Sequence, residues 1–277
     1  MSDLKTLLLH LDSSPSSGHR LDVAVELAGR HAAAITALFT PTTQLADTAC
    51  AYSAGAALSA LAAGAGAGAD DHARSRWQDR LAKADVEVAW VEARGGTVVD
   101  CVQREAAYAD LVILGERPPD LEGDSTAPPG VVESIIVRSG RPALVVPARG
   151  VGAGFGHRAL VAWNGSPQAG RALAAALPLL RQAEAVLVLG WSRQPLAAPL
   201  SGLTIEGFLA RHGVSATVER RHASPRVSHE IAEAAAAWHA DLVVMGCYGH
   251  GRVTELLLGG ATRSILAAMP VATLMAH

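Results

Sequence analysis

The segment Ala240–Gly246 reads ADLVVMG, and the segment Ala109–Gly115 reads ADLVILG, so five of the seven positions are identical. In each segment, an aspartate is followed by a short apolar run that ends at a glycine. Runs this short and this apolar are typical of strands in a parallel sheet, where both faces are buried. Because the run occurs twice in similar surroundings, the sequence indicates an internal repeat.

The repeat extends in both directions from these two segments. Towards the N-terminus, RALVAW ends at Asn164-Gly165-Ser166, and LKTLLLHL ends at Asp12-Ser13-Ser14. Towards the C-terminus, RPALVVPA from Arg141 corresponds to MPVATLMA from Met269. Matching landmarks in the same order predict two copies of one domain.

We therefore expect one domain over residues 1–148 and a second over residues 157–277, with a linker near Ala148–His157 (ARGVGAGFGH). The first copy is longer, and most of its surplus falls near residues 43–76. This stretch is rich in alanine and glycine and low in complexity.

Within each copy, apolar runs alternate with stretches that have helical character. In the second copy, Ser166 can cap a helix that has Pro167 at its first position. The elements expected after that helix are a strand at 185–191, a helix near 200–212, a strand at 214–220, a helix at 225–239 and a strand at 241–246. This alternation predicts an α/β fold, made of two tandem copies of an open, doubly wound, Rossmann-like parallel sheet. Each sheet is expected to have five strands in the order 3-2-1-4-5.

Composition excludes several classes of protein. The 277 residues carry a net charge of -3, so no basic field favours nucleic acid as a partner. No signal-like leader and no apolar run long enough to span a membrane occur, so we expect a cytoplasmic protein without a membrane partner. The cysteines fit a reducing compartment and show no zinc-type spacing: Cys50, Cys101 and Cys247.

The loop that follows Gly246 is the candidate ligand site. In a doubly wound sheet, ligands bind beyond the carboxyl ends of the strands, where the strand order reverses. In the second copy this crevice lies between Asn164, which ends strand one, and Gly246, which ends strand four. The segment Gly259–Thr262 then opens a helix, whose unpaired N–H groups attract phosphate. A loop whose glycines only permit the turn is the alternative, and composition alone does not separate the two.

The glycine spacing resembles that of the universal stress protein family, in its tandem form with two domains in one chain. The family signature is a glycine, two residues, a glycine, nine residues, a glycine and then serine or threonine. Gly246, Gly249 and Gly259 match this spacing. Gly260 departs from it, because the family has a hydroxyl there, and Thr262 restores a hydroxyl two residues later.

This resemblance implies that the second copy binds ATP or another adenine nucleotide, with or without Mg²⁺. Asn164 stands where nucleotide-binding members have an aspartate, and it keeps a polar contact without the charge. Trp191 could stack on the base or only pack in the core, and His250 could reach a phosphate or lie exposed in the loop. The expected nucleotide-binding residues are Asn164, Trp191, Met245, Gly246, Gly249, His250, Gly259, Gly260, Ala261 and Thr262.

The first copy departs from the signature in another way. It keeps Asp12, but Gly115 is followed by ERPPDLEGDSTAPPG, and Pro118 stands where Gly249 stands in the second copy. Proline has no N–H to donate, and four acidic side chains in this stretch would repel phosphate. We therefore expect no nucleotide site in the first copy.

The expected function is that of a stress-response sensor or regulator and not of an enzyme. The second copy contains no lysine, which excludes a P-loop NTPase, and no catalytic or metal-binding motif occurs. Cys247 is either a redox-sensing thiol or a small core residue. The alternatives are a slow ATP hydrolase that uses the same crevice, and a scaffold or chaperone-like stress protein without nucleotide. A protein partner is expected for a regulator, but the sequence does not identify it.

The fifth strand of each copy predicts how the copies assemble. Ala143–Ala148 and Val271–Ala276 are apolar and would form exposed edges, which are prone to aggregate unless they are paired. In the family that the chain resembles, separate subunits dimerise through this strand. We therefore expect the two copies to form an intrachain pseudo-dimer, with a homodimer of chains as a further step. The alternative is two separate domains on a linker, each with its edge paired to another molecule.

Overall fold

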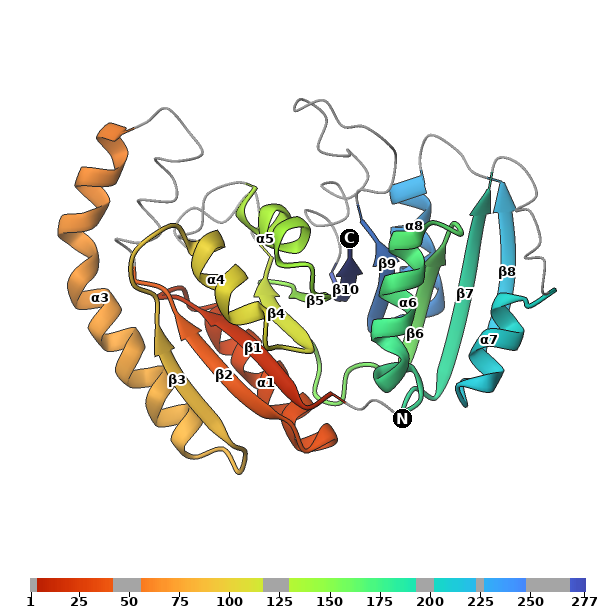
Figure 1. Cartoon of the computed structure of the whole chain (residues 1–277), viewed down its shortest axis with the longest axis horizontal. Coiled ribbons are helices and arrows are strands. Elements are labelled where there is room, and N and C mark those ends of the chain that lie inside the picture. The colour runs from red at the N-terminus through yellow and green to blue at the C-terminus, as the bar shows by residue number, and fades with distance from the viewer. Residues whose placement is uncertain (1–3, 42–55, 117–129, 193–201, 223–226, 248–269) are drawn as a thin grey trace. The chain divides into compact units, whose positions relative to one another are not determined.

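The computed structural model describes residues 4–41, 56–116, 130–192, 202–222, 227–247 and 270–277 (Figure 1). Within α3, side chains are described from Gly68 onwards. The chain divides into two compact units, Met1–Gly150 and Val151–His277.

In its described residues, the first unit has five parallel strands with helices between them. Its elements are β1 (Thr6–Leu11), α1 (Ser17–His31), β2 (Ala34–Phe39), α3 (Ala56–Ala82), β3 (Val88–Glu92), α4 (Val98–Ala106), β4 (Leu111–Gly115), α5 (Val131–Ser139) and β5 (Ala143–Val146). The strand order is β3-β2-β1-β4-β5. In the centre of the sheet, Leu9 of β1 lies opposite Ala37 of β2 and Ile113 of β4.

The second unit repeats this arrangement. Its described elements are β6 (Arg158–Trp163), α6 (Pro167–Leu180), β7 (Ala185–Ser192), α7 (Ile205–Arg211), β8 (Thr217–His222), α8 (Val227–Trp238), β9 (Leu242–Gly246) and β10 (Ala272–Ala276). The order is β8-β7-β6-β9-β10, and the pairs that these strands form within the unit are parallel. The predicted strand order 3-2-1-4-5 and the doubly wound α/β fold are therefore confirmed in both units.

Local sequence signals account for several of these elements. The Ser166 hydroxyl accepts a hydrogen bond from the Ala169 backbone N–H at 3.1 Å, with Pro167 in the first helical turn, so α6 begins where its capping residues predict. The repeated segments form β4 and β9, and in each strand the first four residues are buried. A strand buried on both faces requires this continuous apolar run.

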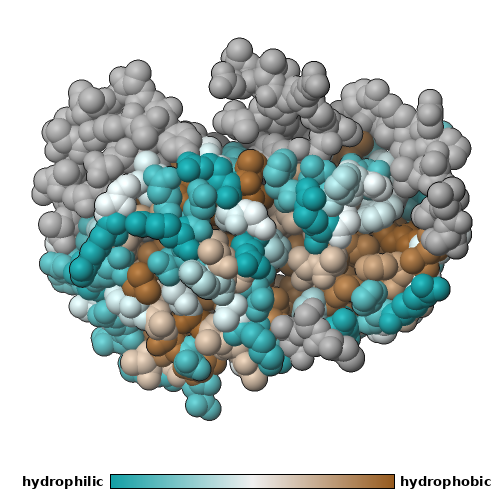
Figure 2. Space-filling view, viewed as in Figure 1, coloured by the Kyte–Doolittle hydropathy of each residue, from teal (hydrophilic) through white to brown (hydrophobic). Residues whose placement is uncertain are grey.

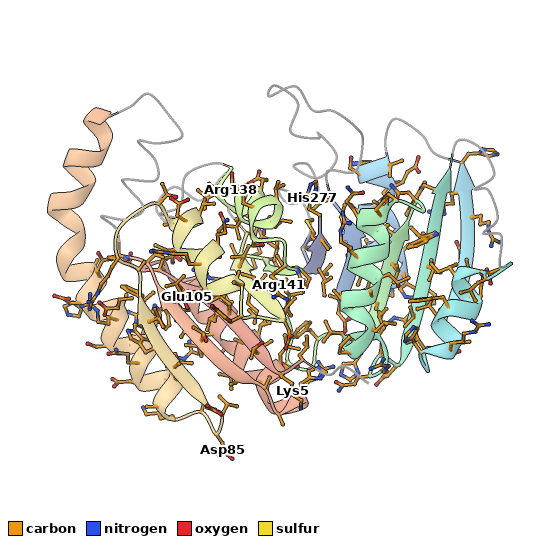
Figure 3. The ribbon with its side chains drawn as sticks, in the orientation of Figure 1. Lys5, Asp85, Glu105, Arg138, Arg141 and His277 are labelled. Carbon is orange, nitrogen blue, oxygen red and sulfur yellow. The ribbon has the colours of Figure 1, made fainter. Side chains whose placement is uncertain are left out.

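An aspartate before the fourth strand of each sheet holds the start of the first strand. Asp110 accepts the backbone N–H groups of Lys5 and Thr6 at 2.8 and 2.9 Å (Lys5 is labelled in Figure 3). Asp241 accepts those of His157 and Arg158, both at 3.0 Å. The repeat in the sequence is thus also a repeat of hydrogen bonds.

The alanine- and glycine-rich stretch of the first unit contributes to a 27-residue helix, α3, which the sequence analysis did not predict. This helix lies along the edge strand β3 (Figure 1), where Arg74 forms an ion pair with Glu92 at 2.7 Å. Trp77 of α3 is buried, and its indole N–H donates to the Asp12 carbonyl oxygen at 3.0 Å. These contacts attach α3 to the sheet near the carboxyl end of β1.

The surface offers few large apolar side chains. The face in Figure 2 shows hydrophobic residues in small groups among hydrophilic ones. Over the described ranges, Tyr108 and Val137 of the first unit are the exposed large hydrophobic residues, with 84% and 36% of their surfaces accessible. None of the helices described in the chain has both the length and the apolar character to cross a membrane.

Candidate functional site

The crevice between strands one and four of the second unit forms where the sequence predicts it. β6 and β9 are parallel neighbours, with Ala162 opposite Met245. Asn164 and Gly246 therefore leave the sheet at the same edge, beyond adjacent strand ends. In a sheet of this order that edge is the switch point at which ligands bind.

Asn164 is exposed at this edge. Its Oδ1 accepts a hydrogen bond from the Ser166 backbone N–H at 3.1 Å, and Gly165 between them has a φ of 72°. This Asx-type turn carries the chain from β6 into the N-terminus of α6. Within the described ranges, the amide nitrogen of Asn164, which can act as a donor, has no hydrogen-bond partner.

Gly246 lies directly against the first turn of α6. A Cβ atom at this position would be 2.4 Å from the Ala169 backbone nitrogen and 2.6 Å from the carbonyl carbon of Gln168. No real Cβ approaches backbone atoms so closely, so the packing of α6 on β9 requires glycine here. From the sequence, Gly246 was expected to bind phosphate or to permit the turn, and this packing requirement was not foreseen.

Trp191 and Met245, two other expected site residues, are buried in the sheet. The Trp191 side chain leaves only 4% of the residue exposed, and its Nε1–H donates to Glu230 Oε2 of α8 at 2.8 Å. Of the two roles expected for Trp191, this geometry favours packing, because the indole N–H and the ring are both used within the unit. Met245 is buried in β9.

Cys247 is also buried, at the end of β9. Burial raises the pKa of its thiol to about 12, against the opposing effect of the nearby Arg171 guanidinium. Its backbone N–H donates to the Ala276 carbonyl at 3.0 Å. Because a reactive cysteine must be ionised and accessible, the structure favours the role of a small core residue over that of a redox sensor.

The remaining expected site residues lie outside the described residues: Gly249, His250, Gly259, Gly260, Ala261 and Thr262. The expectations for these residues therefore rest on the glycine spacing. Within the described ranges, no group of three or more histidine, cysteine, aspartate or glutamate side chains is placed to hold a metal ion.

In the first unit, the residue equivalent to Asn164 is Asp12, and its environment is different. The Asp12 and Arg20 side chains are each 4% exposed, and Arg20 Nη2 lies 2.8 Å from Asp12 Oδ1. Asp12 Oδ1 also accepts hydrogen bonds from the hydroxyls of Ser14 and Ser17. Burial by itself would raise the pKa of Asp12, but Arg20, His10 and the two hydroxyls lower it to about 2.

His10 of β1 completes this buried group. Arg20 Nη1 lies 3.1 Å from His10 Nδ1, and His10 Nε2 lies 2.9 Å from the Thr40 hydroxyl. An arginine can only donate, so Nδ1 accepts and the proton of the neutral imidazole is on Nε2. Burial lowers the pKa of His10 to about 4, with a further contribution from Arg20 against that of Asp12.

The sequence pattern pointed to Asp12 but not to the buried group around it. The signal was a difference between the copies: counted from the Asp12–Asn164 match, His10 and Arg20 correspond to Ala162 and Ala172. A histidine and an arginine at positions where the repeat has two buried or half-buried alanines indicate a polar group inside the first unit. Only the folded structure shows that this histidine and arginine lie together beside Asp12.

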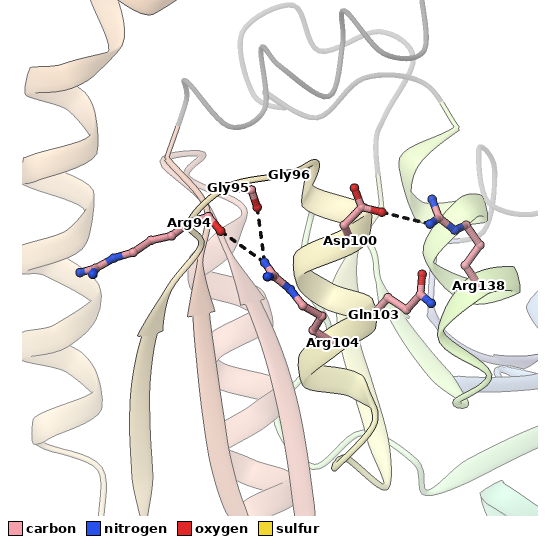
Figure 4. A pocket seen from close by; sticks show the side chains of 7 residues that line it. All are labelled: Arg94, Gly95, Gly96, Asp100, Gln103, Arg104 and Arg138. Carbon is pink, nitrogen blue, oxygen red and sulfur yellow. Dashed lines mark hydrogen bonds and ion pairs between the residues drawn. The ribbon is translucent and has the colours of Figure 1, made fainter.

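A separate hollow of about 490 Å³ lies on the outside of the first unit (Figure 4). It is lined by Arg94, Gly95, Gly96, Asp100, Gln103, Arg104 and Arg138. Arg104 donates to the carbonyls of Arg94 and Gly95 at 3.3 and 3.4 Å, and Arg138 pairs with Asp100 at 3.0 Å. Since its lining includes neither Asp12 nor Gly115, this hollow is distinct from the switch point of the sheet.

Comparison with known proteins supports the fold and a family similarity. Residues 156–277 match the model of the universal stress protein family. A universal stress protein of Synechocystis sp. is 27% identical over 210 residues, which span 71% of this chain and 68% of that protein.

Two solved structures share the fold over both units. A universal stress protein from Archaeoglobus fulgidus superposes with a TM-score of 0.69 at 17% identity, over 98% of this chain and 97% of that chain. A protein of unknown function from Pseudomonas aeruginosa has a TM-score of 0.60 at 16% identity, over 99% of this chain and 92% of that chain. At these identities the similarity is one of fold.

Proposed function

We propose that this chain is a tandem universal stress protein whose second unit binds ATP or another adenine nucleotide, and that it acts as a stress-response sensor or regulator. One observation carries the proposal: equivalent residues at the two switch points are in opposite states. Asn164 is exposed, whereas Asp12 is buried and already bound to Arg20. The exposed residue belongs to the unit that has the complete glycine spacing.

The proposed site uses backbone donors for the phosphates and Asn164 for the adenosine end. Gly249 and the segment Gly259–Thr262 would supply N–H groups, which suit phosphate because they carry partial positive charge without bulk. Asn164 would contribute its amide N–H to the base or ribose. Mg²⁺ would be held mainly by the phosphates and water.

Calorimetry with ATP at millimolar concentration tests this proposal. Wild-type protein should release or absorb heat that saturates at one nucleotide per chain. Gly249→Val should abolish the signal, because a branched side chain prevents close approach of the phosphate to the backbone. The matched control is Pro118→Val at the equivalent position of the first unit, which should bind as the wild type does.

Two results would contradict the site. Absence of heat from the wild type would exclude nucleotide binding and favour the scaffold or chaperone-like alternative. Equal binding by wild type and Gly249→Val would place the nucleotide elsewhere in the chain.

We further propose that the bound nucleotide is not turned over rapidly. Phosphoryl transfer needs a positioned nucleophile and a metal held by carboxylates. In the sequence from Cys247 to Gly260, Glu255 is the only acidic residue. The second unit also has no lysine. A phosphate-release rate of about 1 per second or more, abolished by Gly259→Val, would instead establish an ATP hydrolase.

We also propose that the apolar fifth strands, β5 and β10, pair with each other. Pairing of these two edges within one chain would make each chain a pseudo-dimer, and two chains could associate further. Light scattering on the full chain and on Gly156–His277 tests this. The fragment should dimerise through its uncovered edge, and a stable soluble monomer would contradict the edge-pairing argument.

A further inference from the structure

The side chain of Arg20 crosses the carboxyl end of β4 to reach the end of β1. A Cβ atom on Gly115 would lie 3.0 Å from Arg20 Cδ, 3.1 Å from Nε and 3.2 Å from Cζ. Gly115 therefore leaves room for the arginine, just as Gly246 leaves room for α6 in the second unit. The guanidinium of Arg20 consequently lies between the ends of strands one and four.

We propose that the first unit contains a guanidinium-binding socket at its switch point and that its own Arg20 is the occupant. Four side chains contact the group. Nη2 donates to Asp12 Oδ1 at 2.8 Å and to the Ser14 hydroxyl at 3.2 Å, and also to the Ser17 hydroxyl. Nη1 donates to His10 Nδ1 at 3.1 Å. The socket thus offers one carboxylate, one imidazole nitrogen and two hydroxyls to a planar cation.

The socket is organised by contacts that do not involve Arg20. The Thr40 hydroxyl lies 2.9 Å from His10 Nε2 and donates to the Leu11 carbonyl at 3.3 Å. It therefore accepts the imidazole proton and leaves Nδ1 as an acceptor. The Ser17 hydroxyl bonds Asp12 at 2.7 Å, and the Asp12 backbone N–H donates back to it at 3.0 Å. Acceptors oriented in this way suit a guanidinium, with its fork of fixed donors, better than a compact ammonium.

The second unit lacks most elements of this socket and keeps only Ser166, at the position of Ser14. Ala162, Asn164 and Ala172 replace the imidazole, the carboxylate and the guanidinium. The switch point of the first unit is therefore occupied by its own Arg20, which pairs with Asp12. The contacts that form the socket all lie inside the first unit, so they do not depend on nucleotide binding by the second.

Removal of the occupant should expose the socket to free guanidinium. We would purify the full chain with Arg20→Ala and record thermal unfolding with 0 to about 20 mM guanidinium chloride, far below denaturing concentrations. Urea, which has a similar shape but no charge, and sodium chloride at equal ionic strength are the matched solutes. The expected result is a lower melting temperature for Arg20→Ala, raised in a saturable manner by guanidinium alone.

Two further variants separate the socket from general effects of charge. Arg30→Ala removes an arginine of the same helix whose ion pair with Glu26, at 3.5 Å, lies near the surface. It should melt close to the wild type and show no response to guanidinium. The double variant Arg20→Ala/Asp12→Asn should lose the response, because the carboxylate that binds the cation is gone. Lack of a saturable response in Arg20→Ala, or an equal response in Arg30→Ala, would overturn the proposal.

A measurement on the wild type covers the case in which Arg20→Ala does not fold. In a buried socket, the Nη protons of Arg20 should exchange with water at least about 100-fold more slowly than those of Arg30 in nuclear magnetic resonance spectra. Equal exchange rates for the two arginines would also overturn the proposal, whatever the behaviour of the variant.

Discussion

Replacement of Gly246 by alanine tests how tightly the second unit is packed at its candidate site. The added Cβ would lie 2.4 Å from the Ala169 nitrogen, 2.6 Å from the Gln168 carbonyl carbon and 2.9 Å from the Ala169 Cα. All three are backbone atoms of the first turn of α6, so no side chain can rotate to relieve the contact. Gly246 is not among the glycines with positive φ, so the expected cost comes from crowding alone.

The magnitude follows from two opposing effects. Overpacking by one methyl group costs about 1–3 kcal/mol, and a rigid backbone neighbour places Gly246→Ala near the upper end of that range. Restriction of the unfolded chain offsets about 0.4–1 kcal/mol of this cost. We therefore expect the free energy of unfolding of the second unit to fall by about 2 kcal/mol.

Gly170→Ala is the matched control. Gly170 also lies in α6, but no atom lies within 4 Å of the position that its Cβ would take. Alanine should therefore stabilise the helix by about 0.5–1 kcal/mol. Urea unfolding followed by circular dichroism gives both values from the shift of the midpoint at constant slope. A Gly246→Ala protein as stable as Gly170→Ala would refute the packing of α6 on β9.

Three further outcomes are expected. Because the pKa of His10 is lowered from 6.5 to about 4 in the folded chain, the unfolded chain takes up a proton first, and the first unit should lose about 3 kcal/mol of stability as pH falls from 6.5 to 4. Urea unfolding across this range should show the loss in the wild type but not in His10→Gln. If the free energy of unfolding depended on pH equally in both proteins, His10 would not be the group responsible. Because Cys247 is buried and the pKa of its thiol is raised, iodoacetamide should label it at pH 8 no faster than the protein unfolds. Faster labelling, measured by mass spectrometry, would favour a redox-sensing thiol. Glu230→Ala should cost about 1–3 kcal/mol by leaving the buried Trp191 N–H unpaired, as measured by urea unfolding, while the exposed Glu233→Ala should change stability by less than about 0.5 kcal/mol.

The fold could be predicted because its signals are local. The repeated ADLV segments identify β4 and β9, and Ser166-Pro167 marks the start of α6. The alternation of strands and helices then predicts a doubly wound sheet, and the strand order is taken from the order common in such sheets. Helix α3 could not be predicted in this way, because glycine disfavours helices in isolation and the helix is attached by the distant contacts of Trp77 and Arg74.

The repeat and the alternation of strands and helices can be read from the sequence alone, because both are local patterns. The strand order, and with it the edge at which Asn164 and Gly246 lie, follows once the sheet is taken to have the order common in doubly wound folds. Only the tertiary structure decided which side chains face one another at that edge. Asp12 is buried because Arg20, eight residues away on α1, crosses Gly115 of β4 to reach it. Gly246 is needed because the first turn of α6 lies against β9. Such contacts join residues that are far apart in the chain, and their geometry is set by packing, which no local pattern contains.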